Sequence, residues 1–169
     1  MKRIQEVLNL QNSDFMTELI KILATLSKAN ICFFATADDD LKHAKTQVFY
    51  AHNEIAENFS YALKHTPCSH VLCDRESIFA SNVAQLFPED ILLLELGIEG
   101  YVGMPIKNKN KKHMGILVGL YEDEIRDVHE IKKLYQMTAD LIAFNLDKDN
   151  SDSCQMINEK DIRRLCRNF

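Results

Sequence analysis

The strongest constraint on the fold of this chain is a pair of apolar segments in its second half. Residues 101–106 read Tyr-Val-Gly-Met-Pro-Ile and residues 113–121 read His-Met-Gly-Ile-Leu-Val-Gly-Leu-Tyr, with the charged segment 107–112 between them. Two apolar runs joined by a short polar connection predict adjacent antiparallel strands with an exposed turn. Because neither run alternates polar with apolar residues, we expect both faces of this hairpin to be buried.

Helical periodicity near both ends of the chain predicts two long helices. After potential capping residues at 12–14, apolar side chains recur at helical spacing at Phe15, Leu19, Ile22, Leu23 and Leu26. After the acidic segment 122–124, the same spacing recurs at Val128, Ile131, Leu134, Tyr135, Leu141 and Ile142. The first pattern continues for a turn or two into residues 1–11, and Asn30 suits the left-handed residue that ends the first helix.

The middle of the chain predicts short strands and short helices. Aromatic and β-branched residues indicate strands over 31–35 and 46–51, and a shorter strand over 77–80. Pro88 suits a first helical position and Gly97 suits a helix end, which predicts a helix over 88–96. Because strands and helices do not alternate regularly, the order of elements predicts an α+β fold with a central antiparallel sheet.

The composition is that of one globular domain. The chain has 169 residues, of which 46% are hydrophobic and 27% are charged, enough for a single sizeable core. A net charge of −5 without a basic stripe argues against a nucleic-acid partner. No signal peptide and no apolar run of about 18 residues is found, so we expect a soluble cytoplasmic protein with no membrane segment. Five cysteines without framework spacing predict reduced thiols.

Three short motifs carry more specific information. Residues 65–68 read His-Thr-Pro-Cys, Val83 is followed by Phe-Pro-Glu-Asp at 87–90, and residues 99–105 read Glu-Gly-Tyr-Val-Gly-Met-Pro. Together they resemble the motifs of signalling-type GAF domains, which are Gly-Thr-Pro-Cys, a valine followed by Phe-Pro-x-Asp, and Glu-Ser-Tyr-x-Gly-x-Pro. The sequence departs from this pattern at His65 and Gly100.

The GAF resemblance covers about residues 26–145 in layout and implies how the domain is organised. A central antiparallel sheet would carry the N- and C-terminal helices on one face and connecting helices and loops over the other. Residues 1–28 would form an N-terminal amphipathic helix within the domain, residues 29–147 the GAF core and final helix, and residues 148–169 a polar linker and basic C-terminal tail.

The resemblance also implies a pocket under the connecting helices. We expect a mainly apolar lining, with these candidates: Phe33, Phe49, Cys68, Phe79, Phe87, Tyr101, Met104 and Leu117. The alternative is that the same residues fill a solid core. No catalytic residue is expected among them.

One cluster contains residue types that bind metals: His65, Cys68, His70 and Cys73. If residues 67–72 are helical, Cys68 and Cys73 project about 140° apart. His70 and Cys73 share a face, but two ligands do not make a structural zinc site. We therefore expect neither zinc nor haem.

Other cofactors and ions of GAF domains and acidic turns are also not expected. Bilin-binding relatives carry an adjacent Cys-His pair, whereas Ser69 separates Cys68 from His70 here. The cyclic-nucleotide signature of GAF domains is not found. The acidic run 38–40 predicts a solvated turn rather than a cation site.

For function, the resemblance implies a stand-alone GAF domain that acts as a non-catalytic small-molecule sensor or regulatory adaptor in bacterial signal transduction. No output domain follows, so we expect a signalling protein partner and a homodimer through the terminal helices. One alternative is a purely structural dimerisation or interaction module with a filled pocket. Another is a thiol enzyme similar to the free methionine sulfoxide reductases, with Cys68 as the candidate residue.

Overall fold

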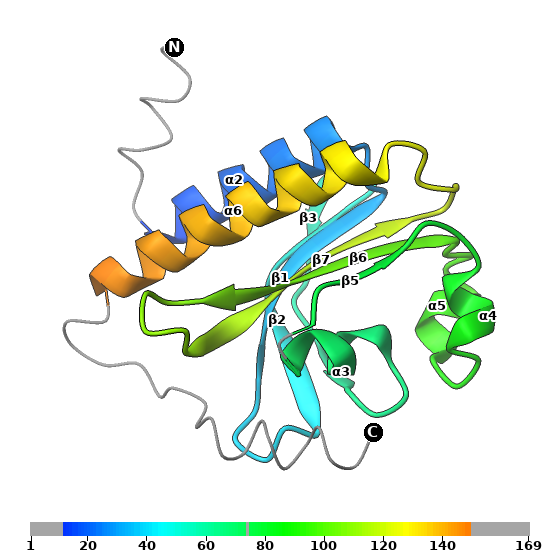
Figure 1. The fold of residues 1–169 in the computed structure, drawn as a ribbon, viewed down its shortest axis with the longest axis horizontal. Coiled ribbons are helices and arrows are strands. Elements are labelled where there is room, and N and C mark those ends of the chain that lie inside the picture. Colours follow the sequence, from blue (N-terminus) through cyan, green and yellow to red (C-terminus); the bar gives the residue numbers. More distant parts are fainter. Residues whose placement is uncertain (1–11, 74, 150–169) are drawn as a thin grey trace.

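The computed structural model describes residues 12–73 and 75–149, which build one central sheet (Figure 1). The sheet has seven strands, namely β1 (Ile31–Ala37), β2 (His43–Ala51), β3 (Glu54–Ala56), β4 (Ser60–Ala62), β5 (Ser77–Phe79), β6 (Gly100–Lys107) and β7 (His113–Tyr121). Their order is β3-β2-β1-β7-β6-β5, with β4 also paired to β2, and every pair is antiparallel. This topology, with helices on both faces, confirms the predicted α+β fold.

Two long helices cover one face of the sheet. They are α2 (Asn12–Ser27) and α6 (Val128–Asp149), which lie side by side across the strands (Figure 1). Their inward residues, among them Ile20 and Ile142, pack with Met104 and Leu117 in one apolar core. This arrangement of the terminal helices is the one that the GAF resemblance implied.

The first helix ends earlier than predicted. Lys28, not Asn30, takes the left-handed conformation, with φ of 60°. Asn30 instead connects two strands: its Oδ1 accepts a hydrogen bond from the N–H of Glu122 at 3.0 Å, and its N–H donates to the carbonyl of Leu120 at 3.0 Å. The predicted helical turns in residues 1–11 lie outside the described residues, as do residues 150–169 of the predicted tail over 148–169. Residues 148 and 149 are not part of a linker but of α6 (Val128–Asp149).

Three short helices cover the opposite face of the sheet: α3 (Pro67–Leu72), α4 (Val83–Leu86) and α5 (Ile91–Glu95). α3 begins at Pro67, because a first-turn residue needs no N–H partner, and it buries Val71 and Leu72 completely. In contrast, Leu93 is the only buried residue of α5. α3 is therefore anchored in the core, whereas α5 is held by little apolar burial.

The predicted helix over 88–96 is confirmed only for residues 91–95, which form α5, and for its end at Gly97, which has φ of 64°. The predicted start at Pro88 is wrong, because Pro88 lies in the turn between α4 and α5. Phe87 leaves helical geometry with φ of −123°, and its ring packs edge-on against Phe79 at a centroid distance of 5.3 Å. This tertiary contact overrides the local helix signal of the proline and the acidic residues that follow it.

Two strands, β3 and β4, were not predicted. Each has three residues, which is too short for the alternation of polar and apolar side chains to be recognised. Both pair with β2 and extend the sheet beyond β1. β4 matters for the site described below, because it carries Tyr61 and follows Phe59.

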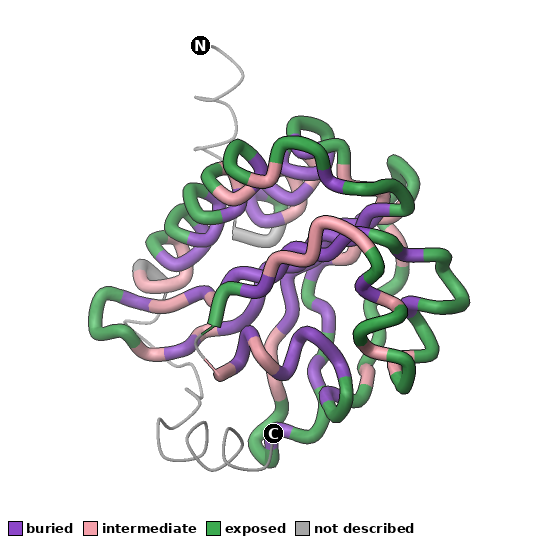
Figure 2. The backbone as a smooth tube through the Cα atoms, turned by 45° about the vertical axis from the view of Figure 1, so that its right-hand side comes forward, coloured by how far each residue is buried: buried purple, intermediate pink, exposed green. Residues whose placement is uncertain are grey.

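The predicted hairpin is formed by β6 and β7, and both of its faces are buried (Figure 2). Successive side chains of a strand point to opposite faces. Tyr101 accordingly packs in the core under the short helices, whereas Val102 and Met104 pack in the core under the long helices. The central strands thus separate two apolar cores. No helix in the described part of the chain is long and apolar enough to cross a lipid bilayer.

Candidate ligand-binding site

An apolar cavity of about 70 Å³ lies between the sheet and the short helices α3 and α5. Its wall comes from the sheet, from the segment around β4, from the start of α3 and from α5: Phe33, Phe49, Phe59, Tyr61, Pro67, Cys68, Asp90, Leu92, Leu93, Leu96, Tyr101 and Leu120. The cavity is on the face opposite α2 and α6, where the resemblance implied a pocket.

Four of the candidate pocket residues lie in this wall: Phe33, Phe49, Cys68 and Tyr101. Phe79 and Phe87 belong to the same apolar core but are set back from the cavity, behind Tyr101, whose ring centroid is 6.1 Å from that of Phe79.

The interpretation of Met104 and Leu117 as pocket residues is corrected by the structure. They are opposite each other in the register of β6 and β7 and lie in the core beneath α2 and α6. Met104 is an odd number of residues from Tyr101, so the pleat turns the two side chains to opposite faces. This spacing excludes a shared face for Tyr101 and Met104, but because both faces of the hairpin are apolar, the sequence pattern does not indicate which of the two residues faces the pocket.

Sequence reasoning missed most of the remaining wall. Phe59 and Tyr61 accompany the unrecognised strand β4, and Leu92, Leu93 and Leu96 belong to α5 and its C-cap. A signal existed for Pro67 and Asp90, since both lie inside the GAF-like motifs. The structure brings both residues to the cavity.

Four aromatic residues in the cavity lining contact one another in a closed circuit, and we call them the aromatic wall: Phe33, Phe49, Phe59 and Tyr61. Each ring contacts the next, with centroid distances of 6.0, 5.0, 5.9 and 6.1 Å around the circuit. The interplanar angles between neighbours are 50°, 89°, 50° and 79°. Neighbouring rings are therefore tilted or edge-to-face, and none are stacked in parallel.

Cys68, in the cavity wall, is hydrogen-bonded to two other wall residues. Its Sγ accepts hydrogen bonds from the hydroxyl of Tyr101 at 3.3 Å and from that of Tyr61 at 3.6 Å. Burial raises the pKa of the Cys68 thiol to about 11, although the two hydroxyls oppose the shift. At neutral pH the residue is therefore a protonated, hydrogen-bonded thiol rather than a nucleophilic thiolate.

Among the described residues, Asp90 is the only charged residue in the cavity wall. It precedes α5, and burial raises the pKa of its carboxyl group, against the opposing effect of the backbone N–H groups of Leu93 and Leu92. No ion pair joins Asp90 to a basic side chain within residues 12–73 and 75–149. The cavity thus has an apolar interior, and the carboxyl group at its wall interacts with the backbone N–H groups at the start of α5.

The residues of the possible metal cluster are dispersed. Cys68 points to the two tyrosines, whereas Nε2 of His65 lies 3.4 Å from Oε2 of Glu89. The ring of His70 packs on Phe87 at 5.3 Å, and burial lowers its pKa. Cys73 is disulfide-bonded, so the expectation of reduced thiols is wrong at this position. Cys32 and Cys68 are free thiols.

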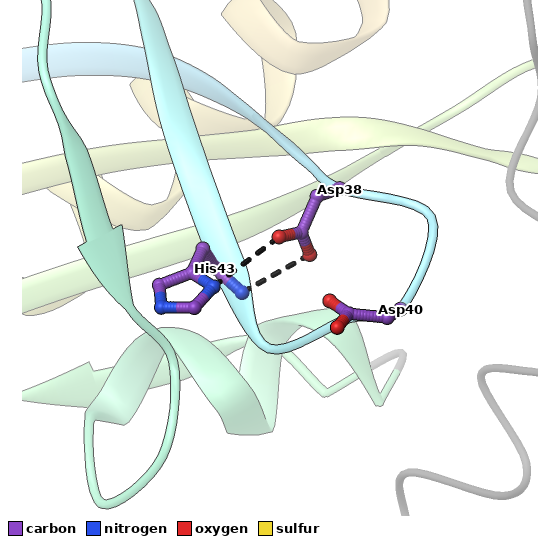
Figure 3. A group of neighbouring side chains, drawn as sticks. All are labelled: Asp38, Asp40 and His43. Atoms are coloured by element: carbon purple, nitrogen blue, oxygen red, sulfur yellow. Dashed lines mark hydrogen bonds and ion pairs between the residues drawn. The ribbon is translucent and has the colours of Figure 1, made fainter.

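Among the described residues, Asp38, Asp40 and His43 do bring potential metal ligands together, on the exposed turn between β1 and β2 (Figure 3). The carboxylates of Asp38 and Asp40 accept hydrogen bonds from the backbone of this turn. Oδ1 of Asp38 accepts hydrogen bonds from the N–H groups of Lys42 and His43, each at 3.0 Å, and Oδ1 of Asp40 accepts one from Lys42 at 3.1 Å. Side-chain acceptors of this kind close a solvated turn, as the sequence predicted.

Comparison with known proteins agrees with the geometry. No protein-family model matches the chain, and no curated protein matches its sequence. Among solved structures, the GAF domain of an Acinetobacter phosphoenolpyruvate-protein phosphotransferase matches with a TM-score of 0.65 and 11% identity, over 89% of this chain and 91% of that chain. The phycocyanobilin-bound GAF domain of a cyanobacterial phytochrome matches with a TM-score of 0.68 and 14% identity, over 91% and 93%.

A far-red cyanobacteriochrome photoreceptor is also similar, with a TM-score of 0.63 and 13% identity, over 87% of this chain and 94% of that chain. Identities this low carry information about architecture and not about ligands. Together with the topology, the paired terminal helices and the cavity under the short helices, they establish that the chain has a GAF-like fold.

Proposed function

We propose that this protein is a non-catalytic sensor or regulatory adaptor of bacterial signal transduction that binds a small molecule in the cavity under α3 and α5. One observation carries the proposal. A mainly apolar, concave cavity between a sheet and its covering helices is the usual form of a small-molecule site.

The size of the cavity restricts the ligand. Pockets for drug-sized molecules measure about 300–1,000 Å³, whereas this cavity measures about 70 Å³. A bilin is far too large for it. The ligand we infer has only a few non-hydrogen atoms, or else places a small group in the cavity and leaves the rest outside.

α5 is the wall through which such a ligand would gain access. It contributes Leu92 and Leu93 to the lining, yet only Leu93 is buried, while Leu92 and Leu94 are 44% and 52% exposed. An element with so few buried contacts opens at low free-energy cost.

β1 connects the cavity with the long helices. Phe33 lines the cavity, and its neighbours Cys32 and Phe34 face the other core. Sγ of Cys32 lies 3.9 Å from the hydroxyl of Tyr135 on α6. A ligand that shifts Phe33 would therefore also shift the part of β1 on which α6 packs. A ligand that binds one arrangement of the helices more tightly than another would transmit the signal in this way.

A thermal-shift and ligand-observed NMR screen with small metabolites tests the proposal. A true ligand raises the melting temperature because it binds the folded state. Leu96→Trp, which places an indole in the cavity wall, should abolish that shift. Leu94→Trp is the matched control, because Leu94 is on the same helix and outside the wall. If no compound raises the melting temperature, or if both variants lose the shift equally, a module with a filled pocket is favoured instead.

The thiol-enzyme alternative is testable at Cys68. With a pKa of about 11, roughly one molecule in ten thousand carries the thiolate at pH 7. We expect the wild-type protein to show no turnover of free methionine sulfoxide. Turnover that is lost in Cys68→Ser would establish the enzyme function and overturn the proposal of a non-catalytic role.

A further inference from the structure

The short helices α4 and α5 carry an exposed apolar surface with acidic residues around it. Of the twelve large apolar side chains that are exposed in the described residues, five lie within residues 86–96: Leu86, Ile91, Leu92, Leu94 and Leu96. The surrounding residues 82–99 contain no lysine, arginine or histidine, and their charged side chains are Glu89, Asp90, Glu95 and Glu99. We call this surface the α4–α5 patch. Exposed apolar residues concentrated in this way are typical of an interaction site.

The C-terminal segment of the chain has the complementary composition. Residues 157–169, which lie outside the described residues, contain two acidic residues and four basic ones: Lys160, Arg163, Arg164 and Arg167. Their apolar residues include four at the spacing of one helical face, namely Ile162, Leu165, Cys166 and Phe169. An apolar face bordered by basic side chains matches an apolar patch bordered by acidic ones in both polarity and charge.

The disulfide of Cys73 independently directs the C-terminal segment to this side of the molecule. Cys73 is the C-cap of α3 and is disulfide-bonded. Neither of the other two described cysteines is its partner, because Cys32 and Cys68 are free thiols. The remaining cysteines of the chain are Cys154 and Cys166. Within one chain, the bond therefore ties the C-terminal segment to the end of α3.

A groove of about 170 Å³ leads from α3 to the α4–α5 patch. One side of the groove is lined by α3 and the residues before it, including Ser69 and His70, and the other side by residues 86–89. His70 is three residues before Cys73 and so lies on the same side of the helix. A segment bonded to Cys73 therefore lies beside the groove and close to the patch.

The chain is long enough to make this connection. Near the end of α6, Oδ2 of Asp147 accepts a hydrogen bond from the N–H of Lys109, in the turn between β6 and β7, at 3.4 Å. β5 runs antiparallel to β6, with Ser77 opposite Gly103, so the chain enters β5 from the same end of the sheet as this turn. An extended stretch over residues 150–165 spans about 50 Å, which exceeds the diameter of a domain of this size.

We propose that residues 157–169 dock on the α4–α5 patch, with their arginines at its acidic border and Cys166 bonded to Cys73. Cys166 is the partner rather than Cys154 because it shares the helical spacing of the apolar residues. A tethered segment has an effective concentration of about 1 mM, so a small interface is sufficient. The docked segment would hold α5 against the sheet and oppose access to the cavity, whichever ligand the cavity binds.

Peptide mapping tests the bond. The full chain is purified without reductant, its free thiols are alkylated under denaturing conditions, and the peptides are identified by mass spectrometry. We expect the peptide with Cys73 to be joined to the peptide with Cys166, and Cys154 to be alkylated. Alkylated Cys73, or a bond between Cys73 and Cys154, would contradict the assignment of Cys166.

Amide hydrogen exchange tests the docking. Arg163→Glu combined with Arg164→Glu should accelerate exchange over residues 91–98 about fivefold, the effect of losing two surface ion pairs. Adding Glu89→Lys and Glu95→Lys should restore the protection, because the charges of the two surfaces are then exchanged. Lys45→Glu combined with Lys111→Glu makes the same change of charge on exposed lysines of β2 and of the turn between β6 and β7, and is the matched control.

The outcomes separate the possible occupants of the patch. Unchanged exchange in the arginine variant, or equal acceleration in the lysine control, would overturn the docking. Failure of the exchanged charges to restore protection would exclude a direct contact between the two surfaces. Protection that is lost on dilution would show that the segment of a second copy occupies the patch, which also contradicts docking within one chain. The ligand screen for the proposed function is independent of each of these results.

Discussion

His65 adopts a left-handed backbone conformation, with φ of 63°, at the position where the GAF pattern has glycine. This conformation costs a residue with a side chain about 1–2 kcal/mol. Its imidazole Nε2 lies 3.4 Å from Oε2 of Glu89, but a pair this exposed stabilises the fold only slightly. The turn before α3 therefore retains the geometry of the motif without its glycine.

We predict that His65→Gly stabilises the protein by roughly 0.5–1 kcal/mol. Relief of the left-handed strain, about 1–2 kcal/mol, exceeds the extra entropy of glycine in the unfolded chain, about 0.4–1 kcal/mol. Urea denaturation measures the difference. His65→Ala is the control, because it removes the ion pair and keeps the strain. Equal stability of the two variants would contradict this explanation.

Gly100, the second departure from the motif, also has a structural cause. A Cβ atom at this position would lie 2.8 Å from Cγ1 of Ile125 and 3.2 Å from the carbonyl oxygen of Ala80. The segment that leads into α6 occupies the space that the serine of the pattern would need. The replacement of serine by glycine thus follows from the packing of Ile125.

The pKa of Asp90 leads to a prediction about stability and pH. Burial raises this pKa, so the native state holds the proton more tightly than the unfolded state does. The corresponding stability is present at low pH and is lost as the pH rises through the raised pKa, above about 4. Asp90→Asn removes this loss and retains a residue suited to a helix N-terminus.

We therefore expect Asp90→Asn to be more stable than the wild type at pH 7, by less than about 1 kcal/mol because the carboxylate is partly exposed. The advantage should shrink as the pH falls towards 4. Denaturant unfolding across this pH range measures it, with Asp39→Asn as the exposed control. A difference that does not depend on pH would exclude a contribution from the Asp90 carboxylate.

Among the elements, α3 and α5 cover the same face but differ in how they are held. α3 buries Pro67, Cys68, Ser69, Val71 and Leu72, whereas α5 buries Leu93. α5 also exposes a row of apolar side chains, with Ile91 at 63% and Leu94 at 52%. The cavity therefore has one fixed helical wall and one that can separate from the sheet.

We predict that Leu93→Ala releases α5 and destabilises the protein by about 2–4 kcal/mol, the usual cost of truncating a buried leucine. Amide hydrogen exchange over residues 91–98 should accelerate more than exchange in β6 and β7. Leu94→Ala, on the exposed side of α5, should change the stability by less than about 0.5 kcal/mol. Uniform acceleration across the whole domain would contradict an independent movement of α5.

At the scale of the whole molecule, the helix pair presents an apolar stripe to solvent. On α2 it contains Ile22 and Leu26, which are 39% and 60% exposed, and on α6 it contains Met137, Leu141 and Phe144, at 64%, 45% and 51%. The members of each helix are spaced three or four residues apart, so they lie on one side of it. We propose this stripe as the homodimer interface, in which the two helix pairs would form a bundle.

The prediction is that the wild-type protein is a dimer and that Met137→Glu combined with Leu141→Glu is a folded monomer. Two buried carboxylates without partners would disfavour the interface strongly, while both positions are exposed within one subunit. Light scattering after size exclusion measures the mass. Leu86→Glu, at the exposed end of α4, is the control and should remain dimeric. A monomeric wild type at high micromolar concentration would refute the proposed interface.

Local patterns predicted much of this fold. The hairpin of β6 and β7, the strand β1 and the two long helices follow from the spacing and burial preferences of neighbouring residues, and the structure confirms them. The motif at 65–68 predicted the fold although His65 replaces its glycine, because Thr66, Pro67 and Cys68 are the residues that start α3. Short-range physical preferences determine these elements, so a single sequence reveals them.

The cavity was decided by the tertiary structure. Its wall combines Phe33, Phe59, Asp90 and Tyr101, which are far apart in the sequence and meet only when the sheet is assembled. The uniformly apolar hairpin contained no signal for which face Met104 and Leu117 would take, because that depends on the register of pairing and on which helices cover each side. The sequence by itself therefore determined the long helices, the central strands and the GAF-like fold, whereas the contacts between distant segments determined the short elements and the position of the cavity.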